Sequence, residues 1–418
     1  MFHRIFRLTL IFLIITPLLG SSSLPPGNQV ERIRAFTRAI EFDYVAWTLD
    51  ALGVKLYQVA LGTSDYIPSD RRSQLVIEYL GLVSQMNQTQ RMLQQIYADP
   101  DISDPSTAAA QFLEALDKLN EKRSVLEPLA ESILQGQIST TLAQLDLTLG
   151  GQPIPPVLYR TTPPPDALIV SPRHVIRQDA DISISPDLTI EQITKLEEAV
   201  DQGLNVSSLV VGIGGIGLYP TMVMQTTDIN WLVEVVAHEW VHNFLTLRPL
   251  GISYLSSPEL RIMNETAASI AGKEIARAVV ERYYPHYLPQ PVSESESTPE
   301  PETGESAPFN FRREMRITRV TVDQLLSEGK IEQAESYMEE RRRYFWDNGY
   351  LIRKLNQAYF AFYGAYADVA GGAAGDDPVG AAVRLLRAQS PNLAHFLNRI
   401  SWLWSYDQLQ KVVAKGGN

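Results

Sequence analysis

The chain has 418 residues, of which 45% are hydrophobic and 20% charged, so it can bury a core and is expected to form roughly two or three folded units. Its formal net charge of −12, without a basic cluster, argues against nucleic acid as a partner. The absence of cysteine excludes disulfides, thiolate catalysis and a cysteine-bound lipid anchor.

Residues 1–23 have the features of an export signal. Arg4 and Arg7 precede an apolar run over residues 8–19, which is shorter than the ~20 residues of a membrane-spanning helix and typical of a signal-peptide core. A buried helix is disfavoured because the run has no periodicity. The segment is either cleaved near Ser22 or retained as an N-terminal membrane anchor. Both outcomes predict a secreted or membrane-anchored protein whose bulk is extracytoplasmic.

Residues 24–150 are predicted to be a helical region. Apolar residues recur at intervals of three and four in three long segments, 31–61, 70–97 and 106–143. No motif in this region indicates chemistry. A plain bundle is the simplest interpretation, and a pro-region or a partner-binding bundle would have the same pattern.

A proline-rich connector begins at residue 151. After it, the sequence predicts both strands and helices. We expect strands at 167–170, 182–184 and 208–211, and a helix over 190–202. The run from Gly212 to Gly217 matches the G-x-G-x-x-G pattern of dinucleotide sites. A proline follows at position 220 instead of a helix, so we reject that interpretation.

The most informative stretch is 231–247, which contains the pattern H-E-x-x-H at residues 238–242. On a helix, His238 and His242 lie one turn apart on the same face and can bind one metal ion. Glu239 lies beside them, close enough to take a proton from a water molecule on that metal. Two exposed histidines on a helix are the ordinary alternative.

The flanks of this stretch favour a buried helix. Thr227 or Asp228 can cap its N-terminus, and no glycine or proline interrupts the run before Pro249. An apolar stripe on another face would hold the helix in the core; it consists of Val233, Val236, Trp240 and Phe244.

Glu265 is the candidate third metal ligand. It lies in a predicted helix that Ser257 caps and Pro258 begins. The loop between the two helices contains Pro249 and Gly251, which lets the chain reverse so that the helices pack antiparallel. Two imidazoles and one carboxylate are a typical ligand set for catalytic Zn²⁺, the expected cofactor. A solvated helix carboxylate is the alternative.

These residues resemble the gluzincin metallopeptidases, whose third ligand is a glutamate on a following helix. Asn264 and Glu265, followed by Ala268, Ile270 and Gly272, resemble the glutamate helix of thermolysin-type enzymes. Such helices often carry an aspartate four residues after the ligand, which orients the first histidine. This chain has Ser269 there, whose hydroxyl can still accept a hydrogen bond from an imidazole.

The resemblance also concerns the segment before the motif helix. In zincins an edge strand at this place lines the cleft and hydrogen-bonds an extended peptide, so we expect residues 217–225 to form such a strand. The neighbouring glycines would permit close approach of the backbone. A glycine-rich hairpin turn explains them equally well.

Residues 289–309 are acidic and contain too few apolar residues to bury, which predicts a disordered linker or insertion. Helices are expected to resume in 310–418, ending in a pair in which Trp402 and Trp404 are packed. Tyr363 and Tyr366 recur at helical spacing. An aromatic stripe is usually core, but the resemblance implies a downstream tyrosine that stabilises the oxyanion, so both are candidate catalytic residues.

The sequence thus predicts a predominantly helical α+β fold. The N-terminal helical region is followed by a zincin-like catalytic core with a small mixed sheet at 151–288, and the C-terminal helical part at 310–418 completes the catalytic unit. The residues 355–358 and the tyrosines after them also resemble a bacterial family of predicted aminopeptidases.

The expected function is that of an exported zinc-dependent peptidase acting on a peptide or protein substrate, with Glu239 as general base. One alternative is a latent or inactive zincin-like scaffold or binding protein with a structural zinc. Another is a zymogen-like arrangement in which the N-terminal helical region covers the cleft. The sequence predicts no particular oligomeric state.

Overall fold

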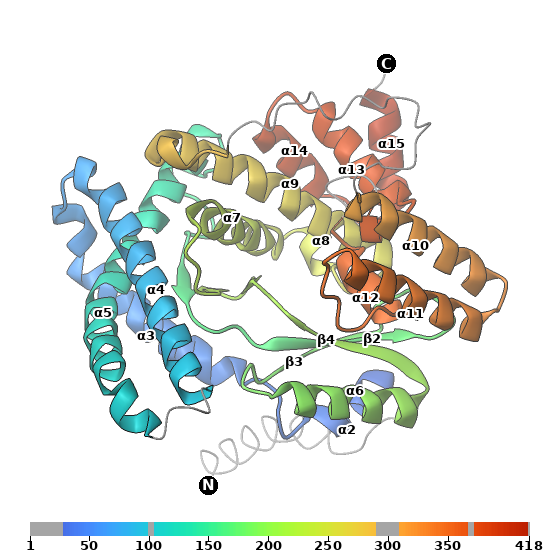
Figure 1. The fold of residues 1–418 in the computed structure, drawn as a ribbon. Coiled ribbons are helices and arrows are strands. Elements are labelled where there is room, and N and C mark those ends of the chain that lie inside the picture. Colours follow the sequence, from blue (N-terminus) through green and yellow to red (C-terminus); the bar gives the residue numbers. More distant parts are fainter. Residues whose placement is uncertain (1–27, 99–103, 290–308, 367–371, 417–418) are drawn as a thin grey trace, which may run out of the picture.

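The structure, a computed structural model, describes residues 28–98, 104–289, 309–366 and 372–416 (Figure 1). The expected signal peptide or anchor, and the acidic segment over residues 290–308, lie outside the described residues. The described part is mostly helical with two small sheets, in agreement with the expected α+β class. No helix in these described ranges is long and apolar enough to cross a membrane.

The N-terminal region is helical, as predicted. Its elements are α2 (Gln29–Thr37), α3 (Tyr44–Leu61), the short η1 (Thr63–Tyr66), α4 (Ser69–Ala98) and α5 (Pro105–Gln144). The expectation of one helix over 31–61 is wrong, because the chain is extended between α2 and α3. There the Phe42 amide donates to the Ser183 carbonyl, and the Asp43 side chain accepts from the Ala46 amide to begin α3. A capping aspartate and a strand contact together outweigh local helix propensity.

The larger sheet has the order β3-β2-β4 and is antiparallel throughout. Its members are β2 (Asp166–Pro172), β3 (Ala180–Ile184) and β4 (Val206–Gly212), with α6 (Ile190–Leu204) between β3 and β4. Alternate residues of β2 face opposite sides: Leu168 and Val170 pack with α2 and α6, and Ala167 and Ile169 pack with α12 (Gln357–Tyr363). The strands and the helix predicted in this region are confirmed.

The smaller sheet has the order β1-β6-β5. It contains β1 (Tyr159–Thr161), β5 (Gly215–Ile216) and β6 (Thr221–Val223); β6 is parallel to β1 and antiparallel to β5. The strand predicted within 217–225 is present as β6, but the prediction that it lies at the edge is wrong, because the edge strand on this side is β5. That segment contains the turn after β5 and the central strand β6.

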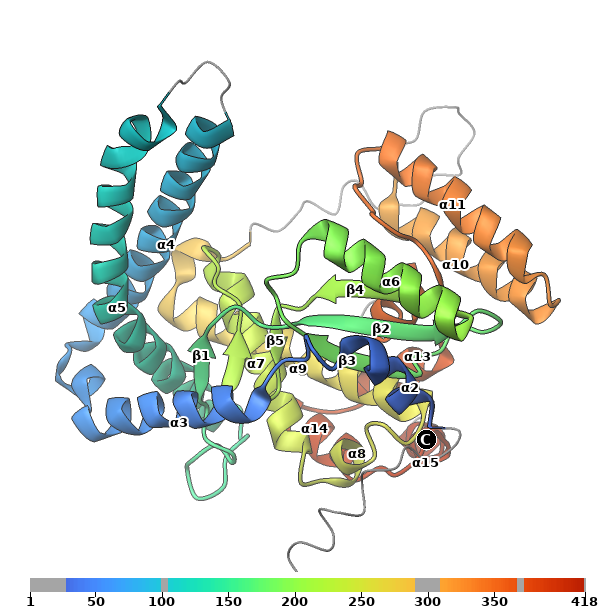
Figure 2. The same cartoon turned by 90° about the horizontal axis from the view of Figure 1, so that it is seen from below.

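Helices α7 (Ile229–Leu245) and α9 (Pro258–Tyr283) form the centre of the molecule, and the short α8 (Pro249–Ile252) lies in the connection between them. The predicted apolar stripe of α7 is buried, with Trp240 only 2% exposed. Leu134 and Ile138 of α5 belong to the same hydrophobic core as α7 and α9. Figures 1 and 2 show α7 and α9 between α3–α5 on one side and the helices α10 (Phe311–Ser327) and α11 (Ile331–Asp347) on the other.

The remaining elements follow α9. They are η2 (Pro285–Tyr287), α10 (Phe311–Ser327), α11 (Ile331–Asp347), α12, η4 (Gly372–Ala374), α13 (Pro378–Ala388), α14 (Leu393–Ser401) and α15 (Tyr406–Gly416). The tail therefore has three helices rather than the expected pair. Trp402 and Trp404 are 64% and 53% exposed, so the expectation that they pack is also wrong, because both lie in the connection between α14 and α15.

A buried ion pair joins the N-terminal helices to the smaller sheet. Lys55 of α3 and Glu131 of α5 are both 2% exposed, and their charged atoms are 2.5 Å apart. The other carboxylate oxygen of Glu131 accepts from the Thr161 amide in β1, at 2.7 Å. Burial lowers the pKa of Lys55, although Glu131 opposes this effect. The pair thus fixes α3 and α5 against the strand that leads into the central region.

Replacing Lys55 with methionine is expected to lower the free energy of unfolding by about 3–5 kcal/mol, because Glu131 would remain buried without its counter-charge. Chemical denaturation of the variant measures this loss. The matched control is Lys118→Met, since Lys118 forms an exposed pair with Glu114, 67% and 70% accessible, and its loss should leave the free energy of unfolding nearly unchanged. If the two variants lost the same free energy of unfolding, burial would not make the Lys55 pair more important for stability than an exposed pair.

Candidate metal centre

The motif helix begins where the sequence predicts it. The Asp228 side chain accepts from the amides of Asn230 and Trp231, which caps α7. Ten residues later, His238 and His242 lie on one face, and their Nε2 atoms are 3.0 Å apart. Both rings are largely buried, with 15% and 18% of their side-chain surface exposed. The ordinary alternative of two exposed surface histidines is therefore not what the fold contains.

Glu265 of α9 completes a cluster of potential metal ligands. Its Oε2 atom is 3.6 Å from His238 Nε2 and 3.5 Å from His242 Nε2. Close packing of α7 on α9 produces this approach, because a Cβ atom at Gly272 would lie only 3.1 Å from the backbone of His238. The three side chains together could hold a metal ion, since their ligand atoms lie within 4.8 Å of one another.

The environment of Glu265 favours a cation. Its Oε1 accepts a hydrogen bond from the Tyr254 hydroxyl, whereas Oε2 is buried without a hydrogen-bond partner. Burial opposes ionisation, but the two imidazoles hold the pKa of this carboxyl well below its usual range. Burial likewise opposes a charge on His242, yet Glu265 raises its pKa to about 9. An orphaned carboxylate oxygen facing two ring nitrogens fits a divalent cation of the zinc type.

Asn264 orients one of the histidines. Its Oδ1 is 2.8 Å from Nδ1 of His242, and its Nδ2 donates to the Leu250 carbonyl. This assignment puts the proton of His242 on Nδ1 and leaves Nε2 as the ligand atom. The sequence pointed instead to Ser269 as a partner of His238. Ser269 is buried, but among the described residues no hydrogen bond joins it to His238.

Replacing Asn264 with leucine is expected to weaken zinc binding by about 10–100-fold, because His242 would lose the group that fixes its tautomer and ring orientation. Competition with a chelating indicator measures the affinity. Ser269→Ala is the matched control on the same helix and should change the affinity less than about twofold. If both variants bind zinc as the parent does, Asn264 has no orienting role.

Glu239 lines the same cleft as the candidate ligands. It is 8% exposed, and burial raises the pKa of its carboxyl. A raised pKa suits a residue that must accept and later return a proton near neutral pH. Strand β5 lies directly against it: an added Cβ at Gly215 would be 3.0 Å from Glu239 Cγ, and one at Gly217 would be 3.3 Å from its Oε2. These glycines let the backbone approach the motif helix closely, and they also belong to the hairpin between β5 and β6; the close approach of a peptide stays a prediction.

The two candidate tyrosines differ in position. Tyr366 lines the cleft, with its ring centroid 6.2 Å from that of His238, and is 36% exposed because it faces the cavity. Burial of its hydroxyl among the cleft walls, with Glu265 nearby, raises its pKa well above the usual value, so it remains a hydrogen-bond donor. Tyr363 is 40% exposed, contacts the Tyr359 ring in a tilted arrangement and does not line the cleft.

The cleft around these residues has a volume of about 400 Å³. Of the described residues that line it, only Tyr44 comes from the N-terminal helical region. The zymogen-like arrangement, in which that region covers the cleft, therefore has no support from the described residues.

Three further lining residues were not found from the sequence. Tyr254 lies in a loop without a motif. Arg261 precedes Glu265 by four residues on α9, and this spacing on one helix face was an available signal. Asp181 of β3 lines the cleft, and burial raises the pKa of its carboxyl. It reaches the cleft only through the pairing of β3 with β2, which local patterns do not reveal.

No protein-family model, curated protein or solved structure matches this chain.

Proposed function

We propose that the chain is an exported zinc-dependent peptidase of the gluzincin type. The observation that carries the proposal is the convergence of His238, His242 and Glu265, in which one buried carboxylate oxygen lacks any hydrogen-bond partner and faces both imidazoles. This ligand set is the one that catalytic zinc sites with an open position use. The N-terminal sequence pattern supports export.

When bound, zinc would act as a Lewis acid and lower the pKa of a water molecule in the cleft. The chain's own residues supply the remaining chemistry. Glu239 accepts the proton of the attacking water and delivers it to the departing amine; its raised pKa favours the first transfer, and the basicity of the amine drives the second. Asn264 and Tyr254 hold His242 and Glu265 in position through the hydrogen bonds described above.

Two features of the cleft suit a peptide. Strand β5 is an edge strand that lines the cleft, so an extended substrate can add to it by backbone hydrogen bonds. Tyr366 keeps its proton and can donate to the oxyanion that develops on the scissile carbonyl. Of the two tyrosines that the sequence offered, we therefore retain Tyr366 and not Tyr363.

The second candidate is a latent or inactive scaffold with a structural zinc. It draws on Ser269, which stands where related sites often have an aspartate and which makes no hydrogen bond to His238 in the described part of the chain. Hydrolysis of a mixed peptide library by the zinc-loaded protein separates the two candidates. The proposal predicts cleavage that a chelator abolishes and added zinc restores. Zinc binding without cleavage of any library peptide would favour the scaffold.

A further inference from the structure

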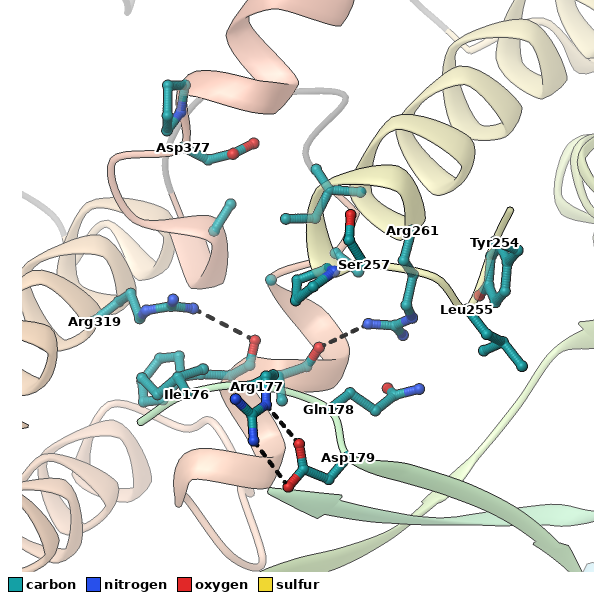
Figure 3. A pocket seen from close by; sticks show the side chains of 18 of the residues that line it. Ile176, Arg177, Gln178, Asp179, Tyr254, Leu255, Ser257, Arg261, Arg319 and Asp377 are labelled. Atoms are coloured by element: carbon teal, nitrogen blue, oxygen red, sulfur yellow. Dashed lines mark hydrogen bonds and ion pairs between the residues drawn. The ribbon is translucent and has the colours of Figure 1, made fainter. Parts of the chain in front are cut away.

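A second cavity adjoins the metal-bearing cleft. It has a volume of about 460 Å³ and lies between the start of α9, the loop before β3 and the segment around α12 and α13 (Figure 3). Tyr254, Leu255 and Arg261 line both cavities, so they form the boundary between them. A ligand that extends from the candidate metal centre into the second cavity would pass directly along Arg261.

Most charges in this cavity are already neutralised. Arg177 pairs with Asp179 at 2.6 Å, and Arg319 pairs with Asp323 at 2.7 Å. Two further lining acids are also occupied: Asp376 pairs with Arg316, and Asp377 caps α13. Among the described arginines that line the cavity, Arg261 is the one without a carboxylate at ion-pair distance.

Arg261 is well placed to receive an anion. The side chain is 9% exposed, and Figure 3 shows it extending from α9 toward Gln178. One terminal nitrogen donates to the Ala361 carbonyl at 3.0 Å, whereas the Nε–H is buried without a partner. The Oε1 atom of Gln178, which lines the same cavity, is also buried without a partner. A buried guanidinium with an unused donor is a strong site for a carboxylate oxygen, and the Gln178 oxygen suits a peptide N–H.

The charge of Arg261 is linked to the candidate metal centre. In the chain alone, burial opposes the charge of Arg261, whereas Tyr254 and the Glu265 carboxylate one turn along α9 favour it and raise its pKa. A cation bound to Glu265 would neutralise the negative charge of that carboxylate. Arg261 would then lose one of the negative charges that balance it, and an anionic ligand would restore the balance.

We infer that the second cavity is a substrate subsite that receives a carboxylate, with Arg261 as the residue that recognises it. The inference rests on the proposed peptidase function for the kind of ligand, a peptide with a free C-terminal carboxylate or an acidic side chain. Arg261 is a specificity residue in this account, not a catalytic one. A purely structural Arg261 would instead only hold α12 through the Ala361 carbonyl.

The test measures binding without turnover. The full chain carrying Glu239→Gln is loaded with zinc and dialysed against three random peptide mixtures that otherwise lack acidic residues. One mixture has a free C-terminal carboxylate, one has a C-terminal amide, and one has the amide plus a single internal glutamate. Mass spectrometry quantifies the retained peptides. At least one carboxylate mixture should be retained about tenfold or more over the amide, which is the scale of one charged hydrogen bond.

Arg261→Gln in the same background should reduce this preference to less than about twofold. Arg261→Lys should leave a weaker preference, because lysine keeps the positive charge but lacks the planar pair of donors that a guanidinium offers to a carboxylate. Arg277→Gln is the matched control, since that arginine lies on the same helix, is exposed and lines neither cavity, and it should keep the preference. The first and third mixtures distinguish a terminal from a side-chain carboxylate.

If the Glu239→Gln chain, with Arg261 in place, retained all three mixtures equally, the inference would be overturned. This result does not depend on whether any Arg261 variant folds. A uniform loss of all three in Arg261→Gln would also overturn it and assign Arg261 a structural role. If carboxylate peptides bind through Arg261 but the parent chain cleaves nothing, the subsite stands and the peptidase proposal fails.

Discussion

Replacing Glu239 with glutamine is expected to reduce peptide hydrolysis by about 10²–10⁴-fold or more while the chain keeps its zinc. Glutamine has nearly the same shape but cannot accept a proton, and Glu239 is not among the three clustered ligands. The residue is buried beside β5, so the variant should also keep the local packing. Initial rates with zinc-loaded protein, together with the metal content of the same samples, measure both effects.

The matched control for this variant is Glu259→Gln, because Glu259 is an exposed glutamate in the first turn of α9 and lies outside the cleft. It should hydrolyse peptides at the parental rate. Parental turnover in Glu239→Gln would contradict the assignment of Glu239 as general base. Loss of zinc in Glu239→Gln would instead make it a ligand.

Replacing His238 with alanine is expected to remove zinc from the purified chain, and hydrolysis with it. A cluster of three protein ligands would be left with one imidazole and one carboxylate, so the loss of affinity should exceed the ~10–100-fold expected when only an orienting partner is removed. Metal analysis after dialysis measures the effect. His286→Ala is the control, since His286 is exposed and outside the cluster. Full zinc retention by His238→Ala would disprove the ligand assignment.

The parts of the fold and site that depend on local spacing could be predicted. The motif helix, its Asp228 cap and its apolar stripe follow from a helical repeat that a single segment displays. The pairing of His238 with His242 needs only their four-residue separation. Glu265 could be proposed because a short reversing loop constrains two long helices to pack on each other.

The parts that depend on tertiary contacts could not be predicted. Asn264, not Ser269, contacts a histidine, because the rotation of α9 against α7 decides which of its polar residues faces the rings. Asp181 and Tyr254 reach the cleft from a strand and a loop whose positions are set by other elements. The break between α2 and α3 likewise depends on a backbone bond to Ser183, which lies far away in the sequence.

Metal analysis of the full chain, purified without chelators and then dialysed, tests the central claim most directly. The proposed centre predicts about one zinc per chain, held by His238, His242 and Glu265. A chain that binds no zinc, even after it is offered the metal in excess, would contradict the claim that these three residues form a zinc site.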